Sequence, residues 1–160
     1  IGFLTATGQT CDNVRQEFIL LSDVLGVSML VESLNHAAGN GLTEATVEGP
    51  FHQIPSPPRQ LGDDINVAGA PGVPCLVTGR VVDRAGRPVV GATVDIWQAD
   101  ASGFYDVQRP AEVPPGQLRG LFRTDGDGRF GFRTIVPAHY PIPTDGPVGD
   151  LLRADRKSVV

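Results

Sequence analysis

The sequence lacks the metal and nucleophile motifs that are simplest to recognise. Its 160 residues contain no HExxH, no paired CxxC and no GxSxG, which excludes zincin, zinc-ribbon and α/β-hydrolase chemistry. Cysteine is scarce, and Cys11 and Cys75 have no nearby partner in the sequence. We therefore expect reduced thiols and a cytoplasmic protein.

Clustered positive charge and long apolar runs are also missing. The net charge is −5 and no stretch gathers Lys and Arg, so the sequence offers no electrostatic footprint for nucleic acid. The longest apolar stretch, Phe18 to Leu30, is interrupted by Ser22 and Asp23. It is too short and too polar for a membrane span.

Turn-forming residues, by contrast, are abundant, with 20 glycines and 14 prolines. Residues 12–38 carry a helical apolar period, with Phe18, Leu21 and Leu25 on one face and a possible break at Gly26. Further on, β-branched segments alternate with turn sequences. We expect strands at residues 76–82, 89–97, 120–124 and 129–135, paired in that order across turns at residues 83–86 and 125–128.

The sequence therefore predicts a mainly β fold, an antiparallel β-sandwich preceded by a short N-terminal helical segment. Residues 49–75 are rich in proline and glycine, which prevents continuous helix or sheet there. We expect a helical segment at 1–48, the β-sandwich domain at 49–154, and a tail at 155–160 that does not look native.

Few side chains stand out as candidates for chemistry. His36, His52 and His139 each lack the second histidine of a metal pair, and a structural role is the simpler interpretation. Tyr105 and Tyr140 both fall in predicted loops. Tyrosine often packs a loop onto a sandwich, so composition and spacing leave that role open.

Four segments carry a more specific pattern. They are residues 20–28, residues 43–51, residues 140–149, and residues 77–105 with Val77, Gly79, Val81, Gly86, Val89, Val94-Asp95-Ile96, Gly103 and Tyr105. Together they resemble the intradiol ring-cleaving dioxygenases over nearly the whole chain, up to about Arg153. Residues 97–100 and 103–108 look most like the hydroxyquinol 1,2-dioxygenases, with catechol and chlorocatechol enzymes as alternatives.

The resemblance implies a non-haem Fe(III) cofactor with Tyr105 and Tyr140 as ligands. Anionic oxygen suits this hard ion, and coordination must displace the proton of a phenol whose usual pKa is about 10. In the family's reaction, Tyr140 would leave the metal and take a substrate proton, while Tyr105 stays bound. Oxygen then opens the ring to a muconate- or maleylacetate-type diacid.

The resemblance also implies the remaining partners. The substrate is a small aromatic diol or triol that reacts with O2, and the N-terminal helices form a homodimer, to which the face of Phe18, Leu21 and Leu25 would contribute. Asp23 could accept a hydrogen bond from an additional ring hydroxyl. The substrate pocket carries over to Leu20, Asp23, Val47, Gly49, Pro50, Phe51, Pro141 and Ile142.

The chain departs from the family pattern at its end. Family members continue to a His-x-His pair that completes the iron site, and no such pair is present here. We therefore expect a fragment, itself inactive, of an active parent enzyme. The rival interpretation is a non-catalytic β-sandwich binding module, because fold alone does not fix function.

Overall fold

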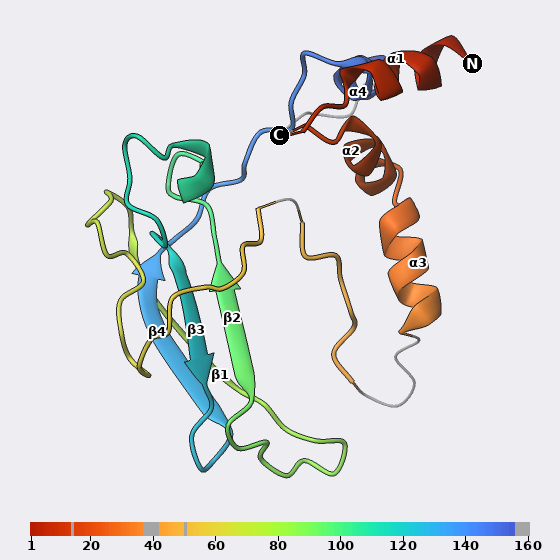
Figure 1. Ribbon diagram of the computed structural model, residues 1–160. Helices are drawn as coiled ribbons and strands as arrows, with labels where there is room; N and C mark the ends of the chain where they lie inside the picture. The colour runs from red at the N-terminus through yellow and green to blue at the C-terminus, as the bar shows by residue number, and fades with distance from the viewer. Residues whose placement is uncertain (14, 37–41, 50, 156–160) are drawn as a thin grey trace. The chain divides into compact units, whose positions relative to one another are not determined.

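The computed structural model describes residues 1–13, 15–36, 42–49 and 51–155 (Figure 1). Predictions that concern Pro50 and the tail from residue 156 onward lie outside the described residues. Two compact units are present: a helical unit of Ile1–Val47 with Pro141–Val160, and a β unit of Glu48–Tyr140. In chain order the elements are α1 (Gly2–Thr10), α2 (Glu17–Val24), α3 (Val27–Asn35), β1 (Pro74–Arg80), β2 (Thr93–Trp97), the short 3-10 helix η1 (Asp106–Gln108), β3 (Arg119–Arg123), β4 (Arg129–Ile135) and α4 (Pro147–Ala154).

The expected helix at 12–38 is two helices, α2 and α3. Gly26 separates them with a left-handed backbone at φ 73°, a conformation that glycine adopts readily. Asp12 does not begin the first one. Its carboxylate accepts the Arg15 N–H at 2.6 Å and its own N–H bonds the Arg15 carbonyl at 2.9 Å, which closes a turn, so α2 begins only at Glu17.

Helix α1 falls within residues 1–48, where a helical segment was expected, whereas α4 was not expected from the sequence. Both pack within the helical unit, and α4 begins with Pro147 at its first turn, a favourable place for proline. In the described residues, every helix is too short or too polar to cross a bilayer.

A buried carboxylate ties α2 to α4. Glu17 is only 1% exposed; it lies 2.9 Å from the Arg15 guanidinium and accepts the Val148 N–H at 3.1 Å. Arg15 also reaches the Asp145 carboxylate at 2.9 Å. A side chain at Gly146 would lie 2.5 Å from this guanidinium, so glycine leaves the space that the network fills.

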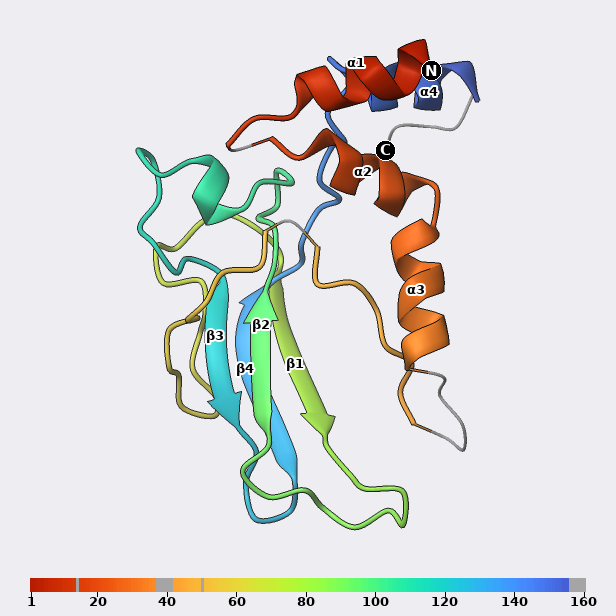
Figure 2. The same cartoon turned by 45° about the vertical axis from the view of Figure 1, so that its right-hand side comes forward.

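In the β unit, the four strands fall close to their predicted places but pair differently. The sequence suggested two consecutive strand pairs, β1 with β2 and β3 with β4, and this is wrong. Instead β1 pairs antiparallel with β4, from Pro74 opposite Ile135, and β2 pairs antiparallel with β3, from Thr93 opposite Arg123. Figure 2 shows β2 and β3 adjacent, with β1 and β4 in the other layer.

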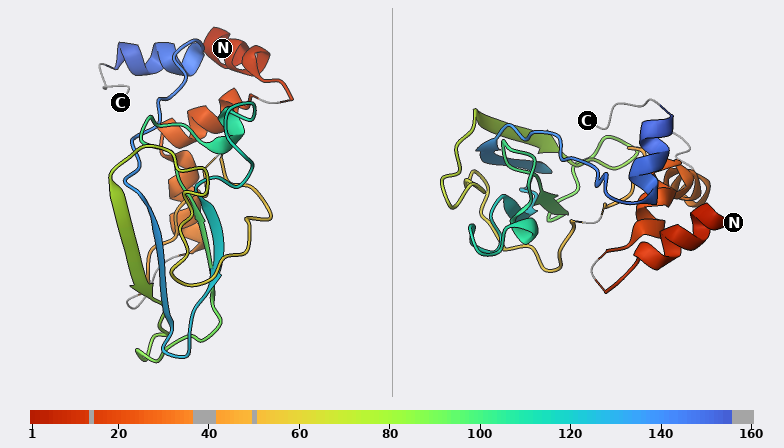
Figure 3. Two further views of the ribbon diagram at one scale, coloured as in Figure 1. Left: turned by 90° about the vertical axis from the view of Figure 1, so that its left-hand side faces the viewer. Right: turned by 90° about the horizontal axis from the view of Figure 1, so that it is seen from above.

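The two sheets pack through aromatic residues that face each other. Phe122 of β3 and Phe132 of β4 stack with ring centroids 5.3 Å apart, and Ile65, Leu118 and Ile135 complete the buried cluster. The turn at 125–128 therefore carries the chain between layers, as the left-hand view of Figure 3 shows. A small antiparallel sandwich is present, but the described helices hold more residues than the strands, so the mainly β prediction is only partly confirmed.

Candidate metal and substrate site

Tyr105 stands at the start of η1, in the loop that follows β2. Its backbone N–H donates to the Gln108 side-chain oxygen at 2.9 Å, and the Gln108 N–H donates to the Tyr105 carbonyl at 3.0 Å. These two bonds satisfy backbone groups that a short helix leaves open at its first turn. They fix the backbone that carries the phenol.

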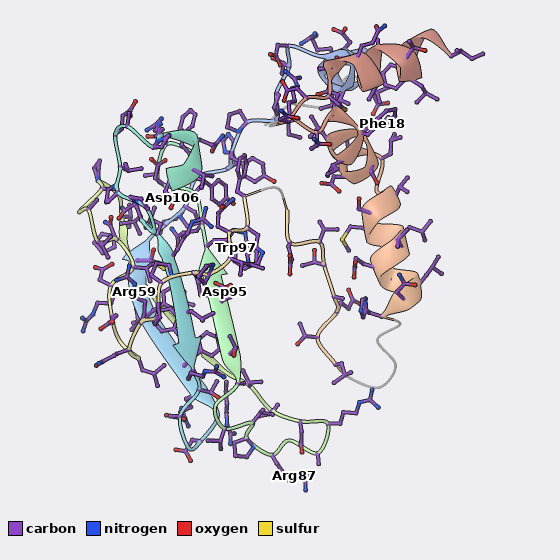
Figure 4. All side chains as sticks on the ribbon, viewed as in Figure 1. Phe18, Arg59, Arg87, Asp95, Trp97 and Asp106 are labelled. Atoms are coloured by element: carbon purple, nitrogen blue, oxygen red, sulfur yellow. The ribbon has the colours of Figure 1, made fainter. Side chains whose placement is uncertain are left out.

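The next residue, Asp106, anchors this loop to the interior. Its carboxylate accepts the Gly116 N–H at 2.9 Å and the Arg119 Nε–H at 2.8 Å, while Arg119 Nη2 lies 2.7 Å away. Both side chains are buried, Arg119 at 3% exposure. In the part of the chain that the structure describes, Arg119 Nη1 has no hydrogen-bond partner. Figure 4 labels Asp106 above the sheet ends.

Tyr140 reaches the same end of the β unit from the segment after β4. The Ala138 N–H donates to the Asp100 carbonyl at 3.0 Å, and Gly103, at φ 83°, would place a Cβ atom only 2.3 Å from the His139 carbonyl oxygen. Only glycine permits so close an approach of the two backbones. The loops of Tyr105 and Tyr140 therefore meet main chain against main chain.

Three aromatic rings meet at this point. Phe51 stacks on Tyr105 with centroids 4.5 Å apart, and Phe51 meets Tyr140 edge-on at 5.5 Å. The two tyrosine rings lie 5.7 Å apart at an interplanar angle of 71°. Burial raises the pKa of the Tyr105 phenol above 10.0, Tyr140 raises this pKa further, and the charge of Arg119 lowers it in part.

The donor chemistry around these rings is phenolic. In the described residues, no three His, Cys, Asp or Glu side chains gather in a way that could hold a metal ion. Two adjacent phenols are hard oxygen donors once deprotonated, which suits a ferric ion better than a soft metal. A pair of phenols leaves further coordination positions to be filled by other groups.

Of the predicted site residues, the structure brings Phe51, Tyr105 and Tyr140 together. Gly49 belongs to the same β unit. Pro50 lies outside the described residues, and the helical unit holds the others, with Leu20 and Asp23 half-buried on α2. Also in that unit are Val47, Pro141 and Ile142.

The sequence interpretation missed the contacts of three residues near this site, of which His52 is the first. His52 Nδ1 lies 3.2 Å from Glu48 Oε2 and its Nε2 lies 3.2 Å from Asp95 Oδ2. His52 has no second histidine at metal-pair spacing, but its spacing of four residues from Glu48 was a signal for this ion pair. Asp106 and Arg119 were missed too, because no local pattern links residues thirteen apart in the sequence.

Comparison with known proteins identifies the family of the chain. The family model described as "Dioxygenase" matches residues 47–158, and the one described as "Catechol dioxygenase N terminus" matches residues 1–43. The chain belongs to the intradiol dioxygenase family.

Within this family, relatives with hydroxyquinol in their names are similar. The chain is 53% identical over 154 residues to the hydroxyquinol 1,2-dioxygenase of Rhizobium sp. (strain MTP-10005), covering 96% of this chain and 52% of that protein. It is 58% identical over 155 residues to the 6-chlorohydroxyquinol 1,2-dioxygenase of Cupriavidus pinatubonensis, covering 96% and 55%. The chain thus spans about half the length of these curated relatives.

Solved structures give the same result. The hydroxyquinol 1,2-dioxygenase from Pseudomonas putida DLL-E4 superposes with a TM-score of 0.93 at 54% identity, covering 99% of this chain and 55% of that one. Catechol 1,2-dioxygenase from Pseudomonas arvilla C-1 has a TM-score of 0.79 at 31% identity, covering 98% and 50%.

Proposed function

We propose that this chain is the tyrosine-bearing part of an enzyme that cleaves hydroxyquinol or catechol between its vicinal hydroxyls, using O2 and non-haem Fe(III). The observation that carries the proposal is the contact of Tyr105 and Tyr140, 5.7 Å apart between ring centroids and on separate loops. A binding module would not need two phenols held together by a backbone contact at Gly103.

The two tyrosines are held unequally, and this supports different roles. Tyr105 is half-buried and sits on a backbone fixed by Gln108 and Asp106. Tyr140 is 38% exposed and follows the last strand in irregular chain. A ligand that stays bound needs a rigid support, whereas a ligand that leaves with a substrate proton needs room. Tyr105 fits the first role and Tyr140 the second.

A ferric ion held between the two phenolates would supply a Lewis acid for the vicinal hydroxyls of the substrate. The Phe51 ring forms an apolar wall beside Tyr105, against which a planar aromatic ring can stack. Arg119 stabilises the phenolate of Tyr105, because its positive charge lowers the pKa of that phenol.

Hydroxyquinol is the favoured substrate, and its chlorinated form is the second candidate because the Cupriavidus relative is named for it. The half-buried carboxylate of Asp23 would accept a hydrogen bond from the third hydroxyl. The rest of the pocket would come from Leu20, Val47, Gly49, Pro50, Pro141 and Ile142.

A chimaera tests the proposal. Residues 1–154 would be joined to the remaining part of the Rhizobium relative, of which this chain covers 52%. The loaded chimaera should show a visible phenolate-to-iron absorption band and consume oxygen with hydroxyquinol. Tyr105→Phe should remove or strongly shift that band. A folded, iron-loaded chimaera that is colourless and cleaves neither hydroxyquinol nor catechol would refute the assignment.

Assembly and location also remain proposals. The exposed apolar residues of α2 and α3 support a homodimer whose interface is formed by the helices within residues 1–48. Leu21 is not part of that surface, since it is buried at 6% exposure, but Phe18 and Leu25 are exposed. The free thiols of Cys11 and Cys75 support a cytoplasmic location.

A further inference from the structure

His52 links an irregular segment to strand β2. Its ring lies between Glu48 Oε2 and Asp95 Oδ2, each 3.2 Å from one ring nitrogen, and packs on Trp97 with centroids 4.4 Å apart. The imidazole side chain is only 13% exposed. Figure 4 labels Asp95 and Trp97 along β2, the strand that leads into the Tyr105 loop.

The segment that His52 belongs to has few other attachments. In residues 42–49 and 51–56, the structure shows no backbone hydrogen bond to another element. Yet Phe51, the neighbour of His52, must keep its ring stacked 4.5 Å from Tyr105. The contacts of His52 with β2 are therefore the main polar restraint on the position of Phe51.

Each ring nitrogen of His52 faces a carboxylate oxygen. A neutral imidazole donates from one nitrogen only, whereas an imidazolium donates from both. The charged groups that face the ring are Glu48, which is 72% exposed, and Asp95, which is 25% exposed. Asp95 Oδ1 is buried without a hydrogen-bond partner in the described residues. The contact of Asp95 Oδ2 with His52 therefore offsets part of the cost of burying this carboxylate.

We propose that His52 is a positioning residue of the aromatic site. Bridged between Glu48 and Asp95, it locks the segment that carries Phe51 onto β2 and so holds the Phe51 ring against Tyr105. Its meaning for catalysis rests on the proposed function, but the positioning itself does not. His52 touches neither tyrosine in this role and acts through Phe51.

The few tyrosine and tryptophan residues of the chain allow the packing around Phe51 to be followed by spectroscopy. Both tyrosines of the chain lie at this site, and its single tryptophan, Trp97, contacts His52. The near-ultraviolet circular dichroism of tyrosine and tryptophan therefore reports on this site alone. The emission of Trp97 reports on His52 as well, because the histidine ring packs on the indole and such a contact quenches indole fluorescence.

The experiment compares His52→Leu with His36→Leu in the 160-residue chain. His36 is the matched control, since it also contacts a glutamate four residues away, Glu32 at 2.8 Å, but lies in the helical unit. His52→Leu should lose most of the tyrosine dichroism and brighten Trp97, with far-ultraviolet dichroism unchanged. His36→Leu should match the parent in all three measurements.

Two additional variants keep the test decisive. If His52→Leu does not fold, Asp95→Asn and His52→Gln should give the same loss of tyrosine dichroism in folded protein. Unchanged tyrosine dichroism in a folded His52 variant would overturn the proposal.

The chimaera separates this inference from the proposed function. There, His52→Leu should lower kcat/KM by about 10- to 100-fold, the cost of a misplaced pocket wall, while iron still binds. If the parent chimaera is inactive but the dichroism of the chain responds as expected, the function fails and the positioning stands. If the chimaera is active and His52→Leu changes neither rate nor dichroism, only the positioning fails.

Discussion

In the β unit, Ile65 and Phe122 are wholly enclosed at 0% exposure, whereas Leu30 and Leu34 on α3 of the helical unit are 58% and 72% exposed. The β unit therefore encloses its own apolar core, and its site is built on that support. The helical unit is held by a buried charge network at Glu17, and it leaves apolar side chains of α3 exposed. The two units are therefore stabilised in different ways.

The largest effect should come from the buried ion pair of the β unit. Replacing Arg119 with Leu leaves Asp106 charged and buried without its partner, which should lower the free energy of unfolding by about 3–5 kcal/mol. Urea unfolding followed at Trp97 measures it. Arg153→Leu is the control, because the Arg153–Asp150 pair is solvent-exposed and should change stability by about 1 kcal/mol or less. Equal effects would remove the distinction between buried and exposed pairs.

The helical unit should respond to the loss of its own buried carboxylate. Glu17→Ala removes a charged acceptor from Arg15 and from the Val148 N–H, at a cost of about 2–3 kcal/mol. Hydrogen exchange should localise the loss to α2 and α4 and leave the strands protected. Loss of protection throughout the strands would mean that the two units do not unfold independently.

Asp23, on α2 of the helical unit, is expected to contribute to substrate choice. In the chimaera, Asp23→Ala should lower kcat/KM for hydroxyquinol by about 10- to 100-fold, because a charged acceptor for one hydroxyl is worth about 1.5–3 kcal/mol. Activity on catechol, which lacks that hydroxyl, should fall much less. A parallel decline on both substrates would assign Asp23 a structural role.

The exposed apolar surface of α3 offers a smaller test. If a second copy covers it, Leu34→Glu should shift the protein from dimer to monomer in light scattering at micromolar concentration. Thr78→Glu, on an exposed position of β1, should leave the assembly unchanged. A parent protein that is already monomeric would contradict the proposed dimer.

The smallest effect concerns alkaline pH. Because burial raises the pKa of Tyr105 above 10.0, the folded chain holds this proton more tightly than the unfolded chain. The resulting stability is complete below pH ~10 and is lost as pH rises further. Tyr105→Phe should flatten the fall of unfolding free energy above pH ~10. Tyr140→Phe should flatten it less, since Tyr140 is only the second cause of the shift.

Local patterns in the sequence predicted the strands and their turns well, because β-branched runs and Asp-Gly turns act over a few residues. The strand partners were wrong, since pairing β1 with β4 depends on packing Phe122 against Phe132, which no local pattern encodes. The start of α2 was misplaced because Asp12 bonds the backbone of Arg15. The roles given to Tyr105 and Tyr140 came from the family resemblance, since spacing alone left them open.

The close approach at Gly103 has a consequence for how such a protein can change over time. A side chain there would meet the His139 carbonyl at 2.3 Å, so the separation of the two tyrosine loops is set by backbone atoms. If Phe51 and Asp23 line the substrate pocket as proposed, substitutions at either position would alter which aromatic ring is accepted without altering the separation of the two loops. Single mutations in the pocket would then change the substrate while the distance between the two tyrosine loops stays fixed. A mutation at Gly103 itself would push these loops apart.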